Sequence, residues 1–160
     1  MRTAALSPLV VLALVGCSSA PTYLEAHGHF GDGTVIDFRQ DATLQVGTDT
    51  QTGVDTALLR SVDNSGPPFM GMVVKLDLTQ ITAPGLYTTH HDGSGGAQLH
   101  ILVPAGGYMN TTEYMADGSL DIVALPIDGN DRLEGSFSSV VVNYDNQDIT
   151  VDEGTFRGQL

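Results

Sequence analysis

Apolar and polar residues alternate in short runs from residue 23 to the end of the chain, a pattern typical of β-strands with one buried face. The first two runs, residues 23–30 and 34–39, flank the loop Gly31-Asp32-Gly33. A three-residue loop that contains glycine is a hairpin signal, and it predicts that Phe30 pairs with Thr34.

This register gives the hairpin one apolar face and one polar face. On the polar face it sets Glu25 opposite Arg39 and His27 opposite Asp37. Opposite charges that face each other across two strands stabilise the pairing, so the charge pattern supports the register.

Further alternating runs continue to the C-terminus, separated by turn residues. They predict strands at residues 42–46, 56–62, 70–78, 86–89, 98–103, 108–115, 120–125, 136–144 and 148–151, with turns at 84–85, 104–107, 116–118 and 126–131. About nine or ten short strands with regular turn signals indicate an all-β fold, a single antiparallel β-sandwich or barrel over residues 23–160.

The last two runs predict a second hairpin with a tight turn at Asn146-Gln147. This turn would pair Tyr144 with Ile149 and collect the apolar residues of both strands on one face. It would also set Asp145 opposite Asp148, a repulsive pair unless a cation or water screens it.

The sequence Gly-x-Phe occurs three times, at residues 28–30, 135–137 and 154–156. A glycine inside a strand marks a bend or a place where another part of the chain approaches closely. We therefore expect close approaches at these three glycines, with the phenylalanines packed alongside.

The segment before the predicted strands has a different character. Residues 1–3 carry a positive charge, residues 4–15 carry none, and small residues follow, as in a secretory signal peptide over residues 1–16. An alternative is a membrane-spanning helix over residues 3–24, but Pro8, Gly16 and Pro21 interrupt that stretch.

Leu14-Val15-Gly16-Cys17 resembles the lipobox of bacterial lipoproteins. The resemblance implies that the chain is cut before Cys17, that the thiol receives a diacylglycerol and that the new amino group is acylated. Several acyl chains anchor a protein stably to a bilayer, whereas one holds it only marginally. The other possibility is an ordinary secreted protein in which Cys17, the single cysteine, has no such role.

The residues that follow the lipobox predict how the anchored protein is sorted and held. Residues 17–22 form the lipidated cysteine and a short tether, and five residues reach at most about 18 Å. Ser18 after the cysteine resembles lipoproteins sent to the outer membrane, whereas Asp there more often retains them at the inner one. The predicted location is therefore the bacterial cell envelope, with the bilayer as a partner.

The chain has 19 acidic residues against six lysines and arginines, a formal net charge of −13 at pH 7. Such a field repels nucleic acid and anionic headgroups, which excludes nucleic-acid binding and membrane binding through a basic patch.

Two groups of residues could hold a metal ion. His27 and His29 share one strand face with Asp37 opposite His27, a donor set suited to zinc, to which His90, His91 and His100 could add ligands. The alternative is that His27 simply pairs with Asp37 on a solvated face.

Acidic turns form the second group, since carboxylate and amide oxygens are the ligands that calcium prefers. Their residues are Asp128, Asn130, Asp131, Asp145 and Asp148. Neither turn has the spacing of an EF-hand, and ordinary turn chemistry explains both equally well.

Nothing in the sequence indicates a catalytic site. It contains no Gly-x-Ser-x-Gly elbow, and Gly93-Ser94-Gly95-Gly96 lacks the lysine of a phosphate-binding loop. Methionine and tyrosine residues could line a ligand pocket, although such residues more often fill a core. They are Met70, Met72, Tyr108, Met109, Tyr114 and Met115.

The second half of the chain resembles a type of small, functionally uncharacterised bacterial lipoprotein. The resemblance rests on Ile81–Tyr87, Leu133–Phe137 and Ile149–Phe156, where a Pro-Gly-x-Tyr strand start precedes two Gly-x-Phe strands. It implies an all-β, lipid-anchored protein and brings no catalytic residues with it.

The sequence as a whole predicts a membrane-anchored lipoprotein with a non-enzymatic structural or binding role in the envelope and no obligatory cofactor. The alternatives are a binding domain that depends on calcium or a transition metal and a hydrolase whose site has no recognisable motif.

Overall fold

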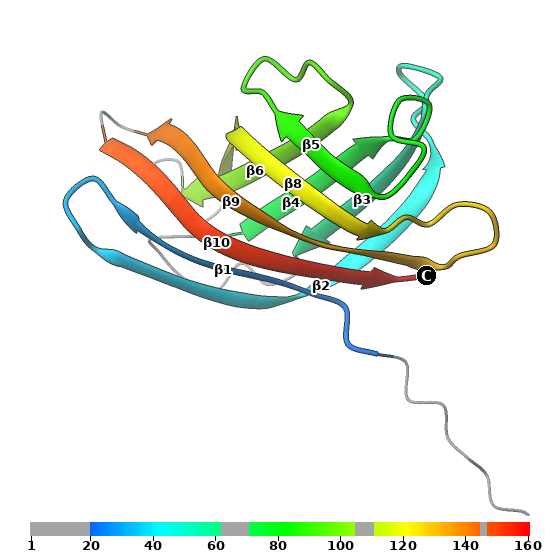
Figure 1. Ribbon diagram of the computed structural model, residues 1–160. Coiled ribbons are helices and arrows are strands. Elements are labelled where there is room, and N and C mark those ends of the chain that lie inside the picture. The colour runs from blue at the N-terminus through cyan, green and yellow to red at the C-terminus, as the bar shows by residue number, and fades with distance from the viewer. Residues whose placement is uncertain (1–19, 62–70, 105–110, 145–146) are drawn as a thin grey trace, which may run out of the picture.

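The computed structural model describes residues 20–61, 71–104, 111–144 and 147–160, and the described chain is all-β, as predicted. Ten antiparallel strands form one sheet in the order β5-β8-β9-β10-β1-β2-β3-β4-β6-β7 (Figure 1). Their bounds are β1 Tyr23–Phe30, β2 Val35–Thr48, β3 Asp55–Ser61, β4 Gly71–Asp77, β5 Gly85–Thr89, β6 Ala97–Pro104, β7 Thr111–Met115, β8 Asp117–Ala124, β9 Arg132–Tyr144 and β10 Gln147–Gln159.

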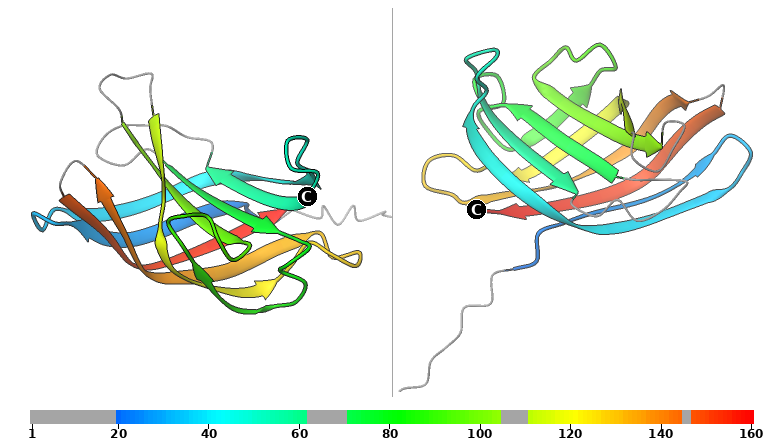
Figure 2. Two further views of the ribbon diagram at one scale, coloured as in Figure 1. Left: turned by 90° about the horizontal axis from the view of Figure 1, so that it is seen from above. Right: turned by 180° about the vertical axis from the view of Figure 1, so that it is seen from behind.

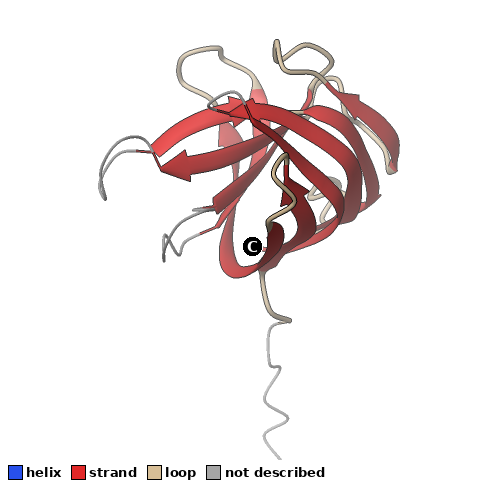
Figure 3. Ribbon diagram, turned by 90° about the vertical axis from the view of Figure 1, so that its left-hand side faces the viewer, coloured by secondary structure: helices blue, strands red, loops and turns tan. Residues whose placement is uncertain are grey.

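The sheet curls into a half-barrel around a single core (Figures 2 and 3). Strand β2 makes this possible because it is long enough to belong to both halves of the sheet. Its first part pairs with β1 and its second part pairs with β3. The two strands predicted at 34–39 and 42–46 are therefore one continuous strand of 14 residues.

The inner face of the half-barrel is apolar. Strands β1 and β3 and most of β2 alternate between buried and more exposed positions, so one face of each strand points into the core. Strand β4 is buried on both faces over Gly71–Val74. The largest fully buried side chains are Phe156, Leu24, Leu59, Met72, Leu76, Ile81, Leu99, Ile101, Leu102, Leu120, Ile122 and Leu133.

The register predicted for the first hairpin is confirmed. The backbone N–H of Phe30 donates to the carbonyl of Thr34 at 2.9 Å, and His27 is the register partner of Asp37. Glu25 lies opposite Arg39, and their side chains form an ion pair.

The register predicted for the last hairpin is wrong by two residues. Tyr144 pairs with Gln147 instead of Ile149, and Asn143 is the residue opposite Asp148. Ile149 and Val151, which were expected on the apolar face of this hairpin, are nevertheless buried in the core. A shift of two residues does not change which face a side chain is on.

Several strand boundaries also differ from the prediction. Asp117 and Gly118, expected in a turn, belong to β8. Strand β10 continues to Gln159, eight residues beyond its predicted end, and pairs along its length with β9. This long β9–β10 ladder joins the edge β5–β8 pair to the centre of the sheet.

The Gly-x-Phe segments of β9 and β10 pack against each other reciprocally. Phe156 lies opposite Gly135 and Phe137 lies opposite Gly154 in the register. A Cβ atom at Gly154 would overlap the Phe137 ring, and one at Gly135 would lie 2.6 Å from the Phe156 ring. The two rings stack with their centroids 6.4 Å apart. The close approaches predicted for these glycines are confirmed.

The third glycine, Gly28, meets backbone instead of a ring. A Cβ atom there would lie 2.9 Å from the Cα atom of Val151. The β1–β10 register shifts between His27 and Gly28, which leaves Asp152 as an extra residue on β10.

Both ends of the described chain lie at the same end of the half-barrel (Figure 1). The backbone N–H of Gln159 donates to the hydroxyl of Thr22 at 3.2 Å, and the N–H of Leu160 donates to the carbonyl of Asp131 at 3.0 Å. The segment that leads into β1 therefore leaves the fold beside its C-terminus.

We expect Gly154→Ala to lower the free energy of unfolding by about 1–3 kcal/mol, the usual cost of overpacking a filled core. Urea denaturation of the purified chain measures this effect. Gly47→Ala is the matched control, since a Cβ atom at Gly47 meets nothing within 4 Å. The packing of Gly154 against the Phe137 ring is refuted as the cause if Gly154→Ala lowers the free energy of unfolding no more than Gly47→Ala does. It is also refuted if Gly154→Ala has the same effect in a chain that carries Phe137→Ala.

Candidate functional site

The candidate site begins on the outer face of the neighbouring strands β3 and β4. Leu58 is the register partner of Lys75, and Arg60 is the register partner of Val73. These four outward positions form a checkerboard, with two cations on one diagonal and two aliphatic residues on the other. Diagonal neighbours in an antiparallel pair lie about 7–8 Å apart, within reach of long side chains.

The checkerboard continues across two further strands. Val73 pairs with His100 on β6, and His100 pairs with Met115 on β7. Together with Glu113, these residues line an outer groove of about 480 Å³. Val73 lies at its floor and is only 3% exposed, although it points away from the core.

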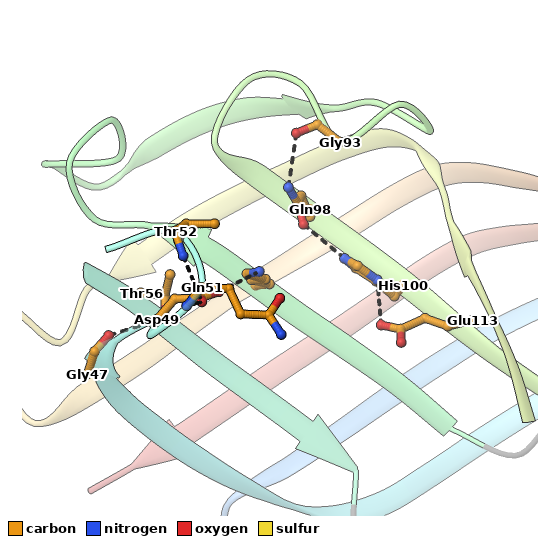
Figure 4. Close-up of polar contacts among 10 residues, drawn as sticks. Gly47, Asp49, Gln51, Thr52, Thr56, Gly93, Gln98, His100 and Glu113 are labelled. Carbon is orange, nitrogen blue, oxygen red and sulfur yellow. Dashed lines mark hydrogen bonds and ion pairs between the residues drawn. The ribbon is translucent and has the colours of Figure 1, made fainter. Parts of the chain in front are cut away.

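The groove meets a second hollow of about 520 Å³ at Leu58 and Lys75. This hollow lies against the turn that joins β2 to β3, where Asp49 accepts hydrogen bonds from the backbone N–H groups of Gln51 and Thr52 (Figure 4). These bonds lower the pKa of the Asp49 carboxyl, which keeps it ionised near neutral pH.

The charged Asp49 in turn holds the ammonium of Lys75. Its Oδ2 atom lies 3.5 Å from Nζ of Lys75, and both side chains are mostly covered. Lys75 is therefore fixed at the junction of the two hollows and does not extend freely into solvent.

His100 forms the opposite wall of the outer groove. Its Nδ1 atom lies 2.6 Å from Oε1 of Glu113, and its Nε2 atom lies 3.1 Å from Oε1 of Gln98, whose amide donates to the carbonyl of Gly93 (Figure 4). The His100–Glu113 contact is close, but Nδ1 of His100 makes no hydrogen bond of acceptable geometry within the described residues.

Burial lowers the pKa of His100, and the charge of Glu113 only partly offsets that effect. The imidazole is therefore neutral at pH 7. Its side chain is 12% exposed, so it acts as a wall of the groove more than as a free surface group.

Arg60 differs from the other basic residues of the described chain. Arg39, Lys75, Arg132 and Arg157 each have a carboxylate within 4.0 Å. Within the described residues no carboxylate lies that close to the exposed Arg60 guanidinium. Among the described residues it therefore stands at the groove without a charge partner.

The predicted histidine group lies on the outer face of β1 and β2, and none of its residues lines the groove. Nδ1 of His27 is 3.0 Å from Asp37, and its Nε2 is 3.4 Å from Glu25. His29 shares the face, as predicted, but its Nδ1 lies 3.2 Å from Asp152 on β10. Each histidine thus has carboxylate neighbours of its own.

In the first acidic turn, residues 126–131, two of the polar side chains form hydrogen bonds that stabilise the turn. The side-chain amide of Asn130 donates to the carbonyls of Leu125 and Arg132, and Asp131 accepts a bond from the Gln159 amide at 3.1 Å. Asp128 is exposed and has a positive φ of 54°. Two of the three predicted ligands therefore hold the turn in place.

The remaining predicted site residues are only partly described. Asp145 and Cys17 lie outside the described residues, and Asp148 is an exposed residue of β10. Among residues 20–61, 71–104, 111–144 and 147–160, no three His, Cys, Asp or Glu side chains form a group that could hold a metal ion. Metal binding stays a prediction.

Sequence reasoning missed the groove. It named His100 as a possible metal ligand and Met115 as a possible pocket residue, but it gave Arg60 and Lys75 no role in a site. The groove could be found only from the register between strands that are far apart in the sequence. Alternation of apolar and polar residues does not give that register.

Comparisons with models of protein families, with curated proteins and with solved structures returned no match. In the described part of the chain, no helix is long and apolar enough to cross a membrane.

We expect Glu113→Gln to lower the pKa of His100 further, because it removes the charge that opposes the effect of burial. Nuclear magnetic resonance titration of the His100 ring measures this. The control is Glu134→Gln, which removes a carboxylate that contacts Arg132 and Arg157. A His100 pKa at or above the ordinary 6.5, or one that Glu113→Gln leaves unchanged, would contradict this description.

The same depressed pKa makes stability depend on pH. The unfolded chain binds a proton at His100 more readily than the folded chain, so the stability that neutral His100 contributes is present above about pH 6.5. It is lost as the pH falls below that value toward the folded-state pKa. Urea midpoints between pH 7 and 5 should therefore fall more steeply for the natural chain than for His100→Gln, and parallel curves would contradict the burial of the ring.

Proposed function

We propose that this chain is a lipid-anchored binding module of the bacterial cell envelope, held to a membrane by acyl chains on Cys17 and acting without catalysis. The observation that carries the proposal is that β1 begins at Tyr23, with only residues 18–22 between it and the lipobox-like Cys17. The fold thus starts directly after the segment that resembles a lipoprotein processing site.

The position of the termini supports this arrangement. The chain enters β1 beside Gln159 at one end of the half-barrel, so a short tether would turn that end toward the bilayer. The outer groove lies on the flank of the half-barrel, on the strands β3, β4, β6 and β7. A ligand can therefore reach it while the protein is anchored.

The character of the groove supports binding. Small-molecule sites combine apolar lining with a few placed polar or charged groups, and this groove has Leu58, Val73 and Met115 beside Arg60 and Lys75. The serine after Cys17 favours the outer membrane as the place where the module acts.

Replacing Cys17 with Ser should abolish incorporation of radiolabelled palmitate, because the thiol that takes the diacylglycerol is gone. Ser19→Ala is the control and should keep the label. If the natural chain takes up no palmitate, or if Cys17→Ser remains labelled, the anchor is refuted.

A further inference from the structure

We propose that the outer groove of β3, β4, β6 and β7 binds a small carboxylate ligand with an apolar body. The inference deepens the proposed function, on whose binding role it rests, by naming the class of ligand. It does not depend on the lipid anchor.

The checkerboard of β3 and β4 provides both parts of such a site. Arg60 and Lys75 stand on one diagonal, where a carboxylate placed between them would contact two cations. Leu58 and Val73 stand on the other diagonal and offer aliphatic surface to the rest of the ligand. Met115 extends this surface on β7, two strands beyond Val73.

Arg60 is the group best placed to recognise the carboxylate. Its guanidinium presents paired N–H donors that match the two oxygens of a carboxylate. Each other basic residue of the described chain already has a carboxylate within 4.0 Å, so Arg60 alone can take a ligand oxygen without displacing an internal partner.

The charge around the groove disfavours a multiply charged anion. Arg60 and Lys75 are balanced by Asp49 and Glu113, and the buried His100 adds none at pH 7. The chain as a whole carries a formal charge of −13, and its field opposes a multiply charged anion. A monocarboxylate therefore fits better than phosphate or a polyanion.

The size and burial of the groove favour a ligand with an apolar body over a bare anion. Its volume of about 480 Å³ is in the range of small-molecule sites. Val73 is 3% exposed at the floor, and covering the half-buried Leu58 and the partly exposed Met115 would add hydrophobic stabilisation.

Isothermal titration calorimetry with four probes tests the proposal. The full chain carries Cys17→Ser, which keeps all 160 residues and needs no detergent against acyl chains. The probes are octanoate, octanol, octyltrimethylammonium and acetate. We expect saturable binding of octanoate, weaker binding of octanol and acetate, and none of the cation. Octanoate affinity should also fall as salt is raised, because ions screen the charges.

Variants locate the site. Arg60→Gln and Lys75→Gln should each weaken octanoate binding by about tenfold or more, the usual effect of losing a hydrogen bond to a charged group. Arg132→Gln, an exposed arginine outside the groove, makes the same charge change and should leave binding unchanged. Leu58→Gln should reduce the preference for octanoate over acetate.

Three results would overturn the proposal: no saturable octanoate binding, equal affinity for octanol and octanoate, or equal effects of Arg60→Gln and Arg132→Gln. The first two are measured on the chain with an intact groove, so they stand even if a groove variant folds poorly. They leave the anchor untouched, just as a failure of palmitate labelling would leave octanoate binding untouched.

Discussion

A single sheet has two faces and can bury only one of them on itself, and this constraint governs the whole molecule. Here the buried face is the inner one, and the half-barrel closes it around aliphatic and aromatic side chains from most of the strands. The outer face must then be compatible with water over most of its area. An aliphatic residue that is buried on the outer face, as Val73 is, needs long neighbours to cover it, and those neighbours are the residues that shape the groove.

The packing of β9 against β10 shows how closely the curled sheet is filled. Two glycines make room for the two phenylalanine rings of the opposite strand, so each ring lies over a position without a side chain. A ring that covers a cross-strand glycine replaces the packing that the glycine cannot provide. The rings also stack on each other, so the longest ladder of the sheet is fixed by contacts between side chains as well as by its backbone.

The sequence predicted the first hairpin down to its residue pairs because a short glycine loop and opposite charges act together within 17 residues. The last hairpin shows the limit of the same reasoning. Alternation distinguishes one face from the other, so it detects a shift of one residue but not a shift of two, and the turn had to be placed by residue type alone. The β9–β10 register therefore differs from the prediction by two residues, whereas Ile149 and Val151 are buried as expected.

The candidate sites show the same limit: residues on strands that are neighbours in sequence could be placed together, and residues on more distant strands could not. His27 and Asp37 were brought together correctly because their strands are neighbours in sequence and their register was known. The outer groove joins residues from four strands that are linked by longer connections. They are Leu58, Arg60, Val73, Lys75, His100, Glu113 and Met115. The sequence pattern predicted these strands but did not show which of their outward residues would be neighbours. The groove is formed by those neighbouring residues, so it could not be predicted.

The most direct test of the groove as a binding surface is a map of backbone chemical-shift changes when octanoate is added to the isotopically labelled chain. The account predicts that the changes concentrate on β3, β4, β6 and β7, around Arg60, Val73 and Lys75. Changes centred on the histidine-bearing face of β1 and β2, or spread evenly over the sheet, would contradict it.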